Sequence, residues 1–207
     1  MKKIIITSAV LVFAVFQFSA CSSAPTVARI DASTPMDLSG RWNDTDARIV
    51  SASLINDCLN SPAVIQFIQQ FYTEHGRRPA ALVGRFRNDS SEHIDTSIIS
   101  RAMEMAIVNS GIMDFVAGGE TREEIRNERH DQLLFASDET AAALANETGA
   151  TLLLTGSINS IVDRAGGRTV RSYFVSAELT NIETNRRLWM GANDEIRKVI
   201  DQPRRRI

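Results

Sequence analysis

Residues 151–181, TLLLTGSINSIVDRAGGRTVRSYFVSAELTN, contain the strongest indication of the fold class of this protein. Strand patterns run over residues 151–161 and 169–181, and a segment rich in turn-forming residues, Asp163–Gly167, joins them. Along the second strand the apolar side chains alternate and share one face, namely Tyr173, Val175, Ala177 and Leu179. The stretch therefore predicts an antiparallel hairpin with one buried face.

Three further strands are expected around this hairpin. A strand over residues 187–192 follows the turn Ile182–Asn185, which makes the C-terminal part an antiparallel meander. Two short apolar runs come earlier, AALVGRF over residues 80–86 and MDFVA over residues 113–117. Both are predicted to be short buried strands.

Helical spacing of apolar residues predicts five helices between and before these strands. The first is capped by Asp44 or Thr45 and ends at Leu59, and the others cover residues 62–75, 95–110, 121–134 and 137–149. The fourth opens with a capping box, Thr121–Glu124. We therefore expect a single compact α/β domain over residues 41–200, with a mixed sheet of about four to five strands packed by helices.

The N-terminus has the features of an export signal. Lys2 and Lys3 precede an apolar run, and the small residues Ser19 and Ala20 come directly before Cys21. The pattern resembles a lipobox, which predicts that residues 1–20 are a signal peptide and that Cys21 carries lipid. The alternative is a plain secretory signal with an incidental cysteine.

Residues 21–40 follow as a tether rich in Ser, Thr, Pro and Ala. Ser22 comes after the cysteine, and under the sorting rule of enteric bacteria this residue directs a lipoprotein to the outer membrane. The expected location is the outer membrane, with the domain facing the periplasm. Residues 201–207 form a basic tail containing Arg204, Arg205 and Arg206, which is expected to be solvated.

Composition excludes some classes of function. The formal net charge is −2, whereas a nucleic-acid-binding domain is usually basic. Cys58 is the only cysteine besides Cys21, so no internal disulfide is expected, and its apolar neighbours predict a buried thiol.

No pattern of catalytic or metal-binding residues emerges. The three histidines, His75, His93 and His130, lack the spacing of metal ligands. The carboxylates between Glu120 and Glu139 alternate with arginines at helical spacing, which is typical of an exposed helix. The sequence therefore predicts a protein without enzymatic activity, metal or cofactor.

The tip of the predicted hairpin is the candidate partner-binding site. It is glycine-rich and carries three arginines, Arg164, Arg168 and Arg171. The alternative is a solvated turn with no binding role.

Five blocks of sequence resemble the LpoB family of outer-membrane lipoproteins: LSGRWNDTDAR (38–48), LVGRFRNDSSEHIDT (82–96), FVAGGETREEIRNERHDQ (115–132), ASDETAAALANETGATLLLTGSI (136–158) and ELTNIETNRRLWMG (178–191). The resemblance implies a fold similar to the N-terminal domain of TolB. It also implies a periplasmic accessory protein that binds a bifunctional penicillin-binding protein and activates peptidoglycan synthesis. The tether here is shorter than the proline-rich tether of the enteric form of that family.

Two other classes of function remain open. A subunit of an envelope or secretion complex, similar to the CsgG lipoproteins, would need long membrane-spanning hairpins. The only long hairpin, 151–181, is needed for the sheet, so we expect a monomer. An enzyme acting on a wall substrate is the third class, and it lacks candidate catalytic residues.

Overall fold

The computed structural model describes residues 28–31, 34–133 and 148–201. The chain divides into two units, residues 1–34 and residues 35–207, and the second unit contains every helix and strand named below. Among the described residues, no helix combines the length and the apolar character needed to cross a bilayer.

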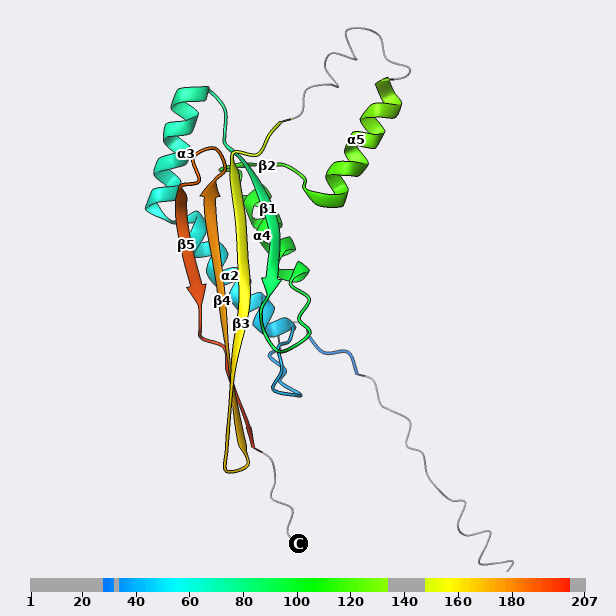
Figure 1. Cartoon of the computed structure of the whole chain (residues 1–207), viewed down its shortest axis with the longest axis vertical. Coiled ribbons are helices and arrows are strands. Elements are labelled where there is room, and N and C mark those ends of the chain that lie inside the picture. Colours follow the sequence, from blue (N-terminus) through cyan, green and yellow to red (C-terminus); the bar gives the residue numbers. More distant parts are fainter. Residues whose placement is uncertain (1–27, 32–33, 134–147, 202–207) are drawn as a thin grey trace, which may run out of the picture. The chain divides into compact units, whose positions relative to one another are not determined.

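Six strands form one mixed sheet in the order β2-β1-β3-β4-β5, with β6 paired to β4 (Figure 1). Strand β1 pairs in parallel with β2 and β3, whereas β4 pairs antiparallel with β3, β5 and β6. Their bounds are β1 (Ala80–Asn88), β2 (Asp114–Phe115), β3 (Leu152–Ala165), β4 (Arg168–Asn181), β5 (Arg187–Asn193) and β6 (Arg197–Asp201). The predicted α/β class with a mixed sheet and a C-terminal antiparallel meander is confirmed.

The decisive hairpin is longer than its sequence pattern indicated. Strands β3 and β4 pair without interruption from Leu152↔Asn181 to Ala165↔Arg168. Gly166 and Gly167 make the turn with φ values of 59° and 85°, a conformation that favours glycine.

Strand β6 is the strand that the expected four to five strands do not include. In β6 the apolar side chain of Val199 is 56% exposed whereas the charged side chain of Lys198 is only 8% exposed, the reverse of the usual burial of apolar residues. Hydrophobic patterning therefore assigns the wrong face to this segment, and only its pairing with β4 makes it a strand.

Three helices cover one face of the sheet (Figure 1). Helix α2 (Asp44–Leu59) packs on β4, β5 and α4, while α3 (Pro62–His75) packs on β5 and α2. Helix α4 (Ser97–Ser110) packs on β1 and β2. The core between these layers contains the fully buried side chains of Leu54, Ile99, Met103, Leu154, Ile158, Tyr173 and Leu179.

Helix α5 (Gly119–Leu133) has no buried residue and packs on no other described helix or strand. It begins two residues before Thr121, so the predicted capping box at Thr121–Glu124 lies inside the helix and is wrong as a helix start. The predicted helix over residues 137–149 falls almost entirely outside the described residues.

The start of α2 also differs from the prediction. Asn43 is the N-cap, because its side-chain oxygen accepts from the Asp46 backbone N–H at 3.1 Å while the Asp46 carboxylate accepts from the Asn43 N–H at 2.9 Å. This reciprocal pair satisfies two backbone donors and places the cap one residue before Asp44.

Candidate partner-binding surface

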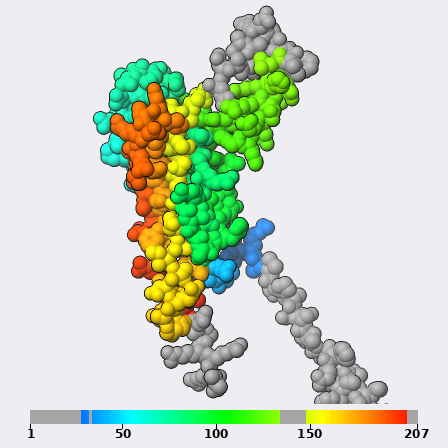
Figure 2. Space-filling model, viewed as in Figure 1, coloured from blue at the N-terminus to red at the C-terminus, as the bar shows by residue number. Residues whose placement is uncertain are grey.

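The second face of the sheet carries no described helix (Figure 1). Because side chains alternate along each strand, those that do not point into the core project from this side. We call this surface the open face and define it by the outward residues around its hollow, Arg85, Arg87, Thr155, Ser157, Ser176, Glu178 and Met190. The β3 and β4 strands are visible on this side of the space-filling view (Figure 2).

A hollow of about 370 Å³ lies on the open face. The hollow forms because the central residues are small: Gly156 and Ala177 line its base, and Ser157 stands opposite Ser176 in the strand register. The two serine hydroxyl oxygens are 3.3 Å apart. The hollow therefore presents hydroxyl groups and exposed strand backbone at its base.

Longer and charged side chains form the rim. Arg85 and Arg87 stand on the β1 side, and Arg87 also pairs with Asp89 at 3.0 Å. On the β5 side Met190 is 63% exposed, and the Glu178 carboxylate is neutralised by Arg187 at 2.9 Å. The rim thus carries two arginines along one side, of which Arg87 is paired with a carboxylate, and one large apolar residue on the other side.

The three arginines predicted as a binding site do not form one surface. Arg164 is exposed near the turn of the hairpin, and Arg168 pairs with Asp201 at 2.7 Å. That carboxylate raises the pKa of Arg168. Arg171 instead points inward, where it contacts Glu92 at 2.5 Å with a side chain only 13% exposed. A binding role for the three arginines stays a prediction, and Arg171 also has a structural role through its contact with Glu92.

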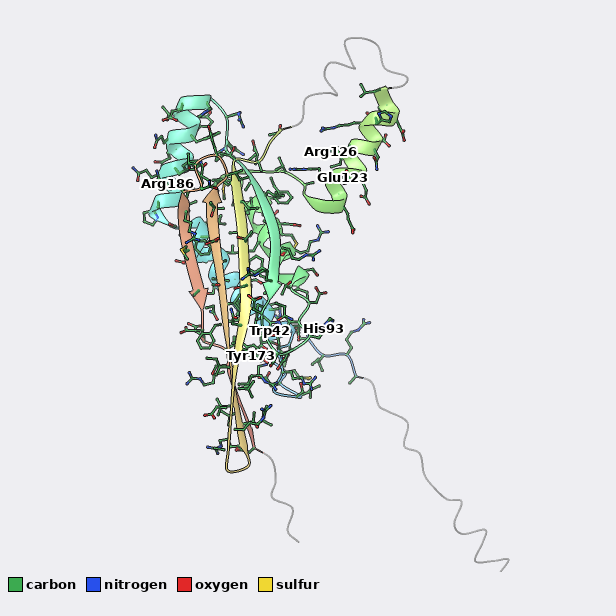
Figure 3. The ribbon with its side chains drawn as sticks, viewed as in Figure 1. Trp42, His93, Glu123, Arg126, Tyr173 and Arg186 are labelled. Carbon is green, nitrogen blue, oxygen red and sulfur yellow. The ribbon has the colours of Figure 1, made fainter. Side chains whose placement is uncertain are left out.

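Glu92 is a central residue that sequence reasoning missed. Its carboxylate accepts from the Tyr173 hydroxyl at 3.0 Å and from the Trp42 backbone N–H at 3.2 Å, in addition to Arg171. The rings of Trp42 and Tyr173 meet edge to face with centroids 5.3 Å apart. Figure 3 labels both residues in the lower part of the domain. The pKa of Tyr173 is raised to about 12, mainly because the hydroxyl is buried and secondly because it lies beside the Glu92 carboxylate.

The histidines lie apart on three segments. His75 stacks on Phe71 near the end of α3, His93 is exposed in the loop between β1 and α4, and His130 is on α5. Within the described ranges, no group of three His, Cys, Asp or Glu side chains is arranged to hold a metal ion.

Two other predicted features can be compared with the structure. Helix α5 has the expected alternation of charge, with Arg126 and Glu123 paired at 3.1 Å (Figure 3). Cys58 is buried as predicted, and burial raises the pKa of its thiol to about 12. Cys21 and residues 202–207 lie outside the described residues, so lipidation and the basic tail stay predictions.

One protein-family model matches the chain. It is described as peptidoglycan-synthase activator LpoB, and it matches residues 46–194, a range that runs from the first turn of α2 to the end of β5. No curated protein sequence matches the chain.

Solved structures with a similar fold include lipoproteins and lipoprotein domains. The C-terminal domain of LpoB from Escherichia coli is 14% identical, with a TM-score of 0.42, and the match covers 76% of this chain and 99% of that chain. The lipoprotein GNA1162 from Neisseria meningitidis is 14% identical, with a TM-score of 0.38, and the match covers 61% and 88% of the two chains. The PelC dodecamer from Paraburkholderia phytofirmans is 15% identical, with a TM-score of 0.31 and coverage of 56% and 71%.

Proposed function

Because this chain belongs to the LpoB family of peptidoglycan-synthase activators, we propose that it binds a bifunctional penicillin-binding protein and raises its rate of peptidoglycan synthesis. The observation that carries the proposal is the family match over residues 46–194, which includes strands β1 to β5 and nearly all of the helices that cover them. The protein acts by binding and performs no chemistry of its own.

The proposed location is the outer membrane, with lipid on Cys21 and the domain in the periplasm. The export signal and the cysteine that follows it support this location. Several acyl chains on one residue make a lasting anchor, since each buried CH₂ contributes about 0.8 kcal/mol. The anchor keeps the domain within reach of the synthases that build the wall.

The open face is the proposed docking surface. It is the side of the sheet without a described helix, and its hollow combines hydroxyl groups, exposed strand backbone and the basic rim of Arg85 and Arg87. An acidic and partly apolar surface of the synthase fits these groups, because the arginines can pair with carboxylates while Met190 contacts apolar side chains.

Activation follows from selective binding. A synthase that exchanges between a less active and a more active conformation shifts toward the state that the activator binds more tightly. The activator therefore needs no catalytic group, only a difference in affinity between the two states.

The test uses the soluble chain from Ser22 onward, which keeps the whole unit of residues 35–207. We expect it to capture a bifunctional penicillin-binding protein from envelope extract and to speed glycan polymerisation by the purified synthase. Recovery of no synthase, or capture without faster polymerisation, contradicts the proposal. Size-exclusion chromatography is expected to show a monomer, whereas a large ring would favour a subunit of an envelope complex.

Filling the hollow tests the docking surface. Ser176→Trp places a large ring on the open face and is expected to weaken synthase binding at least about tenfold, which corresponds to about 1.4 kcal/mol. Ser53→Trp is the matched control, because Ser53 is exposed on α2, on the other side of the sheet. Equal affinity of the two variants would place the docking surface elsewhere.

A further inference from the structure

Residues 36–43 lie against the body of the domain, although the sequence assigns most of them to the tether. We call this segment the strap. Within it, the Asn43 side-chain amide donates to the Met36 carbonyl at 3.0 Å and to the Asp37 carboxylate at 2.7 Å. Two basic side chains of the sheet, Lys198 on β6 and Arg171 on β4, donate hydrogen bonds to the strap.

These basic side chains bind the strap through its backbone and one carboxylate. Lys198 Nζ donates to the Asp37 carboxylate at 2.5 Å and to the Arg41 carbonyl at 3.0 Å. Arg171 donates to the Gly40 carbonyl at 3.1 Å. The contacts therefore fasten two successive carbonyl groups of the strap to strands β4 and β6.

Close backbone packing adds to this attachment. Gly40 has a φ of 59°, and a Cβ atom at this position would lie 2.6 Å from Cδ1 of Ile200. Only glycine satisfies both conditions, because other residues rarely adopt this φ and would collide with β6. Trp42, at the end of the strap, packs on Tyr173.

The groups beneath the strap stay paired without it. Lys198 also contacts the Asp46 carboxylate at 2.6 Å, and both side chains are less than a tenth exposed. Arg171 likewise keeps Glu92 at 2.5 Å. Release of the strap therefore leaves neither buried cation without a counter-ion, which removes the main electrostatic penalty of opening.

Apart from Trp42, which is partly buried against Tyr173, the strap buries little apolar surface: Met36 is 40% exposed and Leu38 is 88% exposed while the strap is in place. Opening therefore separates one pair of aromatic rings and few other apolar contacts. Segments with few buried apolar contacts open at lower free energy than the core. Opening stops at Asn43, whose reciprocal bonds with Asp46 belong to the start of α2.

From these contacts we propose that the strap is a clasp with a closed and an open state, and that its opening lengthens the tether without unfolding the domain. With the strap closed, the tether from Ser22 to Pro35 spans at most about 50 Å, and with the strap open the tether extends to Trp42 and spans at most about 75 Å. The gain of about 25 Å in reach depends on the lipid anchor proposed above. The opening of the strap does not depend on that anchor.

Cleavage by trypsin measures the opening. Arg41 is a cleavage site whose carbonyl is held by Lys198 in the closed state, and Arg29 is an exposed reference site ahead of the strap. In the chain from Ser22 onward we expect slower cleavage at Arg41 than at Arg29. When opening and closing are fast, the rate at Arg41 reports the population of the open state.

A pair of glycine variants tests the contact with Ile200. Gly40→Ala is expected to raise the Arg41 cleavage rate at least about tenfold, because the added Cβ favours the open state. Gly76→Ala is the matched control, since Gly76 has a φ of 64° but open space around it. Circular dichroism verifies that both variants keep the fold.

A disulfide tests the same contact in the opposite direction. A Cβ at Gly40 would lie 3.9 Å from Cβ of Ile200, within the range of about 3.5–4.5 Å found in disulfides. Oxidised Gly40→Cys/Ile200→Cys is expected to resist cleavage at Arg41, and its reduced form is expected to be cut at least as fast as the unmodified chain.

Equal cleavage of the oxidised and reduced forms, or no acceleration in Gly40→Ala, would overturn the clasp. None of these measurements uses a synthase, so a chain that fails to bind a synthase can still show the clasp. The converse also holds, because binding on the open face does not require the strap to open.

Discussion

The aromatic ring of Phe86 occupies the space in which Gly156 would carry a side chain. The two residues are neighbours in the parallel register of β1 and β3, directly after an irregularity in β1 between Val83 and Phe86. The ring, which is 1% exposed, therefore packs closely against the backbone of β3 at Gly156. Phe86 belongs to the core on the helix-covered face, and Gly156 lines the hollow on the open face, so the two residues pack together through the sheet.

Gly156→Ala is expected to destabilise the domain by about 1–3 kcal/mol, the usual cost of overpacking a core. The added Cβ would collide with the Phe86 ring and approach the Ser176 carbonyl. Chemical denaturation measures the change, and Gly149→Ala is the control because no atom lies within 4 Å of its Cβ position. Equal stability of the two variants would mean that the ring moves aside without cost.

Reversal of the basic rim is expected to weaken synthase binding. Arg85→Glu/Arg87→Glu replaces two positive charges on the open face, and rim charges mainly affect the association rate and its dependence on salt. We expect at least about a tenfold loss of affinity at low salt and a smaller loss at high salt. Arg48→Glu on α2 is the control, and an equal loss in that variant would indicate a non-specific charge effect.

Acid is expected to remove the contribution of Asp37 to stability. Hydrogen bonding to Lys198 is the main cause that lowers the pKa of Asp37 below its usual value of 3.8. This contribution is therefore present above pH 3.8 and is lost as the pH falls through the lower pKa of the folded state.

Asp37→Asn is accordingly expected to be less stable than the unchanged chain near neutral pH. The difference should shrink toward zero in strong acid, because the protonated carboxyl of Asp37 and the amide that replaces it are then both uncharged. Denaturant midpoints of the two proteins across this pH range provide the measurement. A difference that is the same at every pH would exclude the charge of Asp37 as its cause.

Cys58 is expected to be inert toward thiol reagents in the folded protein. Burial, together with the nearby Asp57 carboxylate, raises the pKa of the thiol to about 12, so the reactive thiolate is scarce at pH 8. In the chain from Ser22 onward, which lacks Cys21, a chromogenic disulfide reagent should react only after denaturant is added. Rapid labelling of the folded chain would show that α2 opens readily.

Local patterns predicted the parts of the fold that depend on neighbours in the sequence. Alternation along β4 and the glycine turn defined the hairpin, and helical spacing of apolar residues placed α3 over residues 62–75. The cap of α2 was missed by one residue because Asn43 acts together with Asp46, and reciprocal pairs of this kind are distinguishable only in the folded backbone.

The buried partners of charged residues could not be predicted from the sequence. Arg171 was grouped with Arg164 and Arg168 because the three are close in the sequence, but its position in β4 turns it toward Glu92. Glu92 itself lies in a loop, where no periodic pattern indicates which polar side chain is buried. The strap has the composition of a linker, and its attachment depends on Lys198, more than 150 residues away in the chain.

Periodicity, turn chemistry and blocks of contiguous residues are enough to predict the α/β class, the order of most strands and helices and the resemblance to LpoB. The sixth strand, the buried ion pairs and the closed strap become visible only in the folded chain. Each of these brings together charged or glycine residues from distant segments, and their burial is favourable only when every partner is already in place.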